Sequence, residues 1–121
     1  MRLTRLLIAN RGEVAIRIAR AAADLGIATV GVYAEDDATC LHVRRVDDAR
    51  ALRGRGPRAY LDADALVAIA RETGCDAVHP GYGFLAERAD FAQRCIDARL
   101  VFVGPAPAAR RAKSACSDRK P

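Results

Sequence analysis

The chain has 121 residues, of which 51% are hydrophobic and 29% are charged. This length suits one domain with one core, and the hydrophobic fraction is too high for a disordered chain. The net charge is +5, but residues 1–109 carry 15 arginines against 14 acidic residues, so most of the excess lies in residues 110–121. A basic protein can bind nucleic acid, but here the excess charge lies outside the main part of the chain. Nucleic-acid binding is therefore the weakest of our hypotheses, and we expect no nucleic-acid partner.

No apolar run approaches the ~18 residues that a membrane helix needs, and no secretory signal is apparent before the first turn. The four cysteines form no CxxC pair, and the two histidines are not spaced with them as metal ligands. We therefore expect buried, reduced thiols, no metal site, no membrane partner and a cytoplasmic location.

Predicted strands alternate with predicted helices along the chain. Strands are expected at 5–9, 27–33, 76–80 and 100–104, with one helical turn and a short strand within 40–52. Helices are expected at 13–25, from a cap at Asp62 or Asp64 to residue 74, and at 86–98. The pattern predicts an α/β domain over residues 1–107, with a parallel sheet of about five strands and helices on both faces. Residues 108–121 are predicted to be a basic, disordered tail.

The first predicted helix has an apolar and a polar face. The 3.6-residue period predicts a buried stripe made of Val14, Ile18, Ala21 and Leu25. On the opposite face lie Arg17, Arg20 and Asp24. That face is either solvated, with a weak Arg20–Asp24 pair, or a polar contact with another protein.

Two loops follow predicted strands, at the edge where open α/β sheets bind ligands. The loop at 9–13, ANRGE, is either an anion site at a helix start or a plain turn, and local chemistry favours the turn. The loop at 79–87, HPGYGFLAE, either faces a ligand or packs Tyr82 and Phe84 into the core. His79 is either a general base or, as its position favours, a hydrogen-bonded core histidine. The acidic pairs at 36–37 and 47–48 are expected to be solvated.

The motifs IANRGE at 8–13 and HPGYGFL at 79–85 occur in this order, with YL at 60–61 and FVGP at 102–105. Together they resemble the N-terminal domain of biotin carboxylase, over about residues 6–107. Acetyl-CoA, propionyl-CoA, methylcrotonyl-CoA, pyruvate and urea carboxylases carry a similar domain. The resemblance implies a Rossmann-like, pre-ATP-grasp sheet, which agrees with the predicted strand order.

The resemblance also implies a reaction and a set of roles. In the family, MgATP activates bicarbonate by phosphoryl transfer, and the carboxyl group is placed on biotin held by a carrier domain. ATP and metal are held mainly by domains that follow this one. The matching motif positions imply that biotin faces Tyr82, Gly83 and Glu87. They imply that this loop is supported by His79, Pro80 and Gly81. They imply a mostly structural turn at Asn10, Arg11, Gly12 and Glu13, and a homodimer contact at Arg20 and Asp24.

The chain departs from the family pattern at Ala86 and Arg88, where the family usually has Ser and Asn. After residue 107 the family's Gly-Asp-Lys motif is missing, which predicts a truncation or reading-frame change near residue 108. We therefore expect no catalytic residue, no bound cofactor and no activity in the chain alone. The alternative is a non-catalytic module that docks on a full-length biotin-dependent carboxylase.

Overall fold

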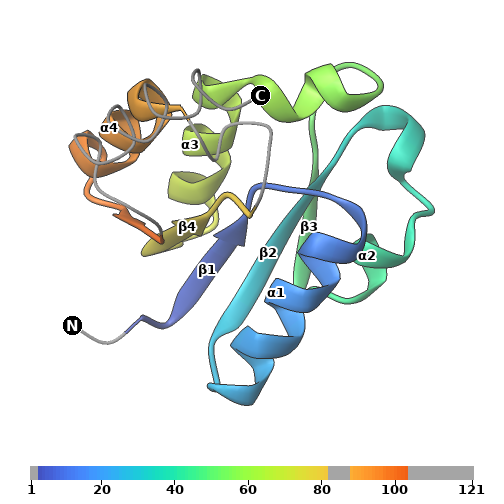
Figure 1. The fold of residues 1–121 in the computed structure, drawn as a ribbon, viewed down its shortest axis with the longest axis horizontal. Helices are drawn as coiled ribbons and strands as arrows, with labels where there is room; N and C mark the ends of the chain where they lie inside the picture. Colours follow the sequence, from blue (N-terminus) through green and yellow to red (C-terminus); the bar gives the residue numbers. More distant parts are fainter. Residues whose placement is uncertain (1–2, 82–87, 104–121) are drawn as a thin grey trace, which may run out of the picture.

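The computed structural model describes residues 3–81 and 88–103 (Figure 1). Five parallel strands form one sheet in the order β3-β2-β1-β4-β5. The strands are β1 (Arg5–Ile8), β2 (Ala28–Tyr33), β3 (Asp48–Ala51), β4 (Ala77–His79) and β5 (Val101–Phe102). The predicted α/β class and the parallel sheet of five strands are confirmed.

The helices lie on both faces of this sheet, as predicted. They are α1 (Gly12–Asp24), α2 (Leu41–Arg44), α3 (Ala63–Glu72) and α4 (Ala89–Asp97), with short 3₁₀ turns η1 (Glu35–Asp37) and η2 (Pro57–Leu61). Figure 1 shows α1 and α2 on one side and α3 and α4 on the other. Right-handed crossovers explain this division, because the chain moves outward from β1 in one direction and from β4 in the other.

Alternation along the strands divides the core between the two faces. In β1, Leu6 and Ile8 pack with the alanines of α1, whereas Leu7 packs with Leu66 of α3 and Phe91 of α4. Asp62 caps α3 by accepting a hydrogen bond from the Ala65 N–H at 3.1 Å, which decides between the two predicted caps. None of the helices within 3–81 and 88–103 combines the length and apolar character that a bilayer crossing requires.

The buried stripe predicted for α1 is wrong for Ala21 and Leu25, whereas Val14 and Ile18 are half-buried. The buried side chains are Ala15, Ala19 and Ala22. By contrast, Leu25 is 73% exposed and Ala21 is exposed. The three alanines are small, so the helix backbone packs closely on the sheet and the larger apolar residues lie beside the contact.

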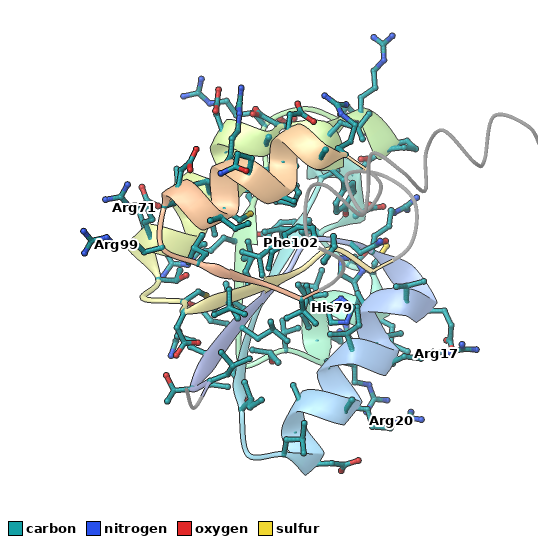
Figure 2. The ribbon with its side chains drawn as sticks, turned by 60° about the vertical axis from the view of Figure 1, so that its left-hand side comes forward. Arg17, Arg20, Arg71, His79, Arg99 and Phe102 are labelled. Carbon is teal, nitrogen blue, oxygen red and sulfur yellow. The ribbon has the colours of Figure 1, made fainter. Side chains whose placement is uncertain are left out.

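Those larger residues border an open apolar groove of about 360 Å³ beside α1. Its lining includes the four residues predicted to be buried, together with Arg17, His79, Gly81 and Val103. Arg17 was expected on the face opposite the apolar stripe, and its position on the groove is a second correction to the predicted helix faces. Figure 2 shows Arg17 and Arg20 projecting from α1.

Candidate functional site

The strand order reverses between β1 and β4, so the loops that follow these two strands lie side by side. The last ladder bond runs from the Ala9 N–H to the His79 carbonyl at 2.9 Å. Beyond it, the chain enters α1 on one side and continues into Pro80 and Gly81 on the other. In open α/β sheets this switch point is where ligands bind. The geometry therefore brings the two sequence motifs together.

Asn10 joins the two loops. Its side chain is 2% exposed, and its Nδ2 donates to the Pro80 carbonyl at 2.8 Å. Its Oδ1 accepts the Arg11 N–H at 2.8 Å. The sequence motif predicts only a local turn at Asn10, because no sequence period reveals a contact between residues seventy positions apart.

Gly81 sits against the same asparagine. Its φ of +68° lies in the left-handed region that favours glycine. A Cβ at this position would lie 2.6 Å from Val14 Cγ1 and 2.7 Å from Asn10 Nδ2. Both the backbone conformation and the close approach therefore require glycine here.

His79 ends β4, and its ring lies near α1 (Figure 2). Its Nδ1 accepts the Gly81 N–H at 3.1 Å. Burial lowers the pKa of His79 below its ordinary value, which favours the neutral ring. Because Nδ1 is the acceptor, the proton of the neutral ring resides on Nε2. The histidine thus helps to shape the turn at Gly81.

A second polar cluster lies beside the start of α1. The Arg11 Nη2 contacts Asp37 Oδ1 at 2.8 Å, and the Tyr60 hydroxyl donates to Asp37 Oδ2 at 2.7 Å. The Tyr60 hydroxyl also accepts the Ala34 N–H at 3.0 Å. Asp37 is only 5% exposed, so the expectation that the acidic pair at 36–37 is solvated is wrong for this residue.

The charge of Asp37 is stabilised by its neighbours. Burial alone would raise its pKa, but the hydrogen bonds from Tyr60 and Arg11 hold the pKa below its usual value. The Arg11 guanidinium also lies 5.8 Å from the centroid of the Tyr60 ring. The half-exposed cation of the ANRGE turn is therefore paired with a buried carboxylate.

The Gly12 N–H at the start of α1 also has a partner inside the protein. The Gly12 N–H approaches His42 Nδ1 at 3.4 Å, and His42 Nε2 lies 3.1 Å from the Val32 carbonyl. Together with the Arg11–Asp37 pair, these contacts favour the plain structural turn over an anion site.

The remaining predicted residues are placed as follows. Glu13 forms an exposed ion pair with Arg17 at 3.2 Å. Arg20 and Asp24 are exposed on α1, and no ion pair joins them in the part of the chain that the structure describes. Tyr82, Gly83 and Glu87 lie outside the described residues, as does the predicted tail at 108–121.

Within residues 3–81 and 88–103, no three His, Cys, Asp or Glu side chains converge as a metal site would require.

The family model "Biotin carboxylase, N-terminal domain" matches residues 2–109, which is most of the chain. The chain belongs to this family.

Curated relatives and solved structures are similar over the same region. Biotin carboxylase 1 of Bacillus subtilis is 53% identical over 105 residues, which cover 84% of this chain and 23% of that protein. The biotin carboxylase domain of a single-chain bacterial carboxylase is 60% identical with a TM-score of 0.87, covering 89% of this chain and 25% of that one. The biotin carboxylase domain of a thermophilic 2-oxoglutarate carboxylase bound to bicarbonate is 40% identical with a TM-score of 0.89, covering 92% and 25%.

This chain spans only 9% to 23% of the length of the first curated relatives that it matches. The matches include a subunit of a biotin-dependent acyl-coenzyme A carboxylase, a single-chain, multi-domain long-chain acyl-CoA carboxylase and a multifunctional pyruvate carboxylase. What the shared domain contributes to such an enzyme is therefore the functional question.

Proposed function

We propose that residues 1–107 serve as the N-terminal domain of a biotin carboxylase, the ATP- and bicarbonate-dependent ligase that carboxylates carrier-bound biotin. The observation that carries this proposal is the junction of the two family motifs at the switch point of the sheet, through Asn10 and Pro80. The similar domain of the thermophilic 2-oxoglutarate carboxylase, which was solved bound to bicarbonate, supports the same reaction class. The partners in this proposal are the remaining carboxylase domains and the biotin carrier.

In this proposal the loop after β4 faces biotin through Tyr82, Gly83 and Glu87. His79, Pro80 and Gly81 support that loop from below. Their placement favours such a role, because Pro80 is buried, Gly81 packs on Asn10, and His79 holds the Gly81 N–H. The domain thus contributes one wall of the site, and MgATP is bound by other domains of the enzyme.

The 121-residue chain alone is proposed to bind no cofactor and to catalyse no turnover. Phosphoryl transfer needs cationic groups and metal around the γ-phosphate, and the sequence motifs of this chain supply no candidate set for that role. In an assay of bicarbonate- and biotin-dependent ATP hydrolysis, we expect the purified chain to give the rate of the buffer blank. Turnover that scales with the concentration of the chain would contradict this.

Two kinds of partner follow from the exposed face of α1. In the first, Arg20 and Asp24 form a homodimer contact, since both are exposed and no ion pair joins them within 3–81 and 88–103. Sedimentation of Arg20→Glu beside the unchanged chain tests this contact, and an unaltered mass would oppose it.

In the alternative function, the chain is a non-catalytic module that docks on a full-length carboxylase. Co-elution with intact enzyme discriminates the two.

We place the protein in the cytoplasm, where reduced thiols persist. Among the described cysteines, Cys75 and Cys95 are free and buried as expected, whereas Cys40 is free but only half-buried.

A chimera tests the proposed function. Residues 3–103 of this chain replace the matching residues of the Bacillus subtilis biotin carboxylase, and ATP hydrolysis is measured with bicarbonate and free biotin. We expect biotin-dependent hydrolysis, because the inserted residues carry both loop motifs and the two proteins are 53% identical over 105 residues. A chimera that is folded, by circular dichroism and cooperative unfolding, but inactive would overturn the proposal.

A further inference from the structure

The buried side chain of Asn10 lies where the β1–β4 ladder ends. The ladder stops at the Ala9 N–H to His79 carbonyl bond, and the next carbonyl along the chain belongs to the buried Pro80. The Asn10 amide takes up this carbonyl through Nδ2. We propose that Asn10 is a positioning residue that holds Pro80 and Gly81, the support of the biotin-facing loop in the proposed function, on which this inference rests.

The amide group is chemically required for this bridge. The Pro80 carbonyl can only accept, and the Arg11 N–H can only donate, so the linking side chain must present one donor and one acceptor. A carboxylate keeps the acceptor but lacks the donor. A buried carbonyl without a partner is destabilising, so we expect Pro80 and Gly81 to shift in the variant.

Gly81 transmits the position of Asn10 to the loop. The space for a Cβ at Gly81 is taken by Asn10 Nδ2 and Val14 Cγ1, so the turn rests directly on these two side chains. The Gly81 N–H is held in turn by His79 Nδ1. The proposed biotin-facing residue Tyr82 follows immediately in sequence. Displacement of Asn10 is therefore expected to displace Gly81, and so to weaken the use of biotin that the proposed function assigns to this loop.

Asp76 provides a matched control. Its carboxylate also ties the start of β1 to β4, by accepting the Thr4 N–H at 2.9 Å and the Arg5 N–H at 3.1 Å. It does so at the opposite end of the same two strands, away from the switch point. Asn10→Asp and Asp76→Asn thus both remove hydrogen bonds between the same two strands, and we expect only the first to affect Gly81.

The first arm of the test uses the chimera described above. Asn10→Asp is expected to lower kcat/KM for free biotin about tenfold, with the KM for ATP changed less than about twofold. Asp76→Asn is expected to leave kcat/KM for biotin within about twofold of the unmutated chimera. Equal losses in the two variants, or a loss shared by biotin and ATP, would mean that Asn10 acts only through stability.

The second arm uses the 121-residue chain itself and does not depend on activity. Amide exchange at Gly81, measured by NMR, is expected to be about tenfold faster in Asn10→Asp and unchanged in Asp76→Asn. Unchanged exchange in Asn10→Asp would overturn the inference even if the chimera is active. An inactive unmutated chimera would overturn the proposed function, and the exchange at Gly81 would then decide alone whether Asn10 holds this turn.

Discussion

Gly81 and Gly74 form a pair that separates the cost of backbone conformation from the cost of contact. Both have a left-handed φ, +68° and +72°. A Cβ at Gly74 meets nothing within 4 Å, whereas a Cβ at Gly81 would lie 2.6 Å from Val14 and 2.7 Å from Asn10. We predict that Gly74→Ala lowers the free energy of unfolding by about 1–2 kcal/mol, the cost of the left-handed conformation for an L-residue.

Gly81→Ala carries this same cost and a second one. To admit the methyl group, Asn10 has to move away from the Pro80 carbonyl, and a buried carbonyl without a partner costs about 1–3 kcal/mol. We therefore predict that Gly81→Ala lowers the free energy of unfolding by about 2–5 kcal/mol. Urea unfolding at pH 7 with linear extrapolation would measure this loss. Equal destabilisation by the two substitutions, within about 0.5 kcal/mol, would refute the contact. In an Asn10→Ala background, the excess cost of Gly81→Ala should shrink.

Three further predictions concern the core and the buried cluster. Because hydrogen bonds hold the pKa of Asp37 low, its contribution to stability is present above about pH 4 and is lost as the pH falls through the lowered pKa. Urea unfolding between pH 7 and pH 3 should therefore show a smaller loss for Asp37→Asn than for the unchanged chain, and parallel curves would count against the cluster. Burial raises the pKa of Cys95 to about 12, so iodoacetamide should label this thiol only after unfolding; labelling in native buffer, seen by peptide mass, would contradict this. Phe91 is fully buried and packs edge-to-face on Phe102, with the ring centroids 5.7 Å apart. Phe91→Ala should therefore lower the free energy of unfolding, followed by thermal unfolding, by about 3–5 kcal/mol. A loss below about 1 kcal/mol would be inconsistent with this buried packing.

The order of strands and helices could be predicted because its signals are local. The apolar runs, the turn at 10–12 and the glycine after α3 each mark an element boundary within a few residues. The face that α1 buries could not be predicted in this way. Its apolar side is wide, and the choice of Ala15, Ala19 and Ala22 over Leu25 depends on how closely the helix approaches the sheet.

The candidate site was predicted only in part for a similar reason. The two motifs and their place after strands were visible in the sequence, whereas the bonds between them join residues distant along the chain. Asn10 meets Pro80, and Asp37 meets Tyr60, through contacts that no sequence period encodes. The burial of Asp37 was not predicted, because an acidic run is usually solvated. Here Arg11 and Tyr60 bind the Asp37 carboxylate and make its burial favourable.

The most direct test of the central claim is the biotin dependence of ATP hydrolysis by the chimera that carries residues 3–103 in the Bacillus subtilis enzyme. With bicarbonate and ATP fixed, the account predicts that free biotin stimulates hydrolysis, and that Tyr82→Ala lowers kcat/KM for biotin without changing the KM for ATP. A folded chimera whose rate is the same with and without biotin would contradict the claim that this domain forms the wall of a biotin site.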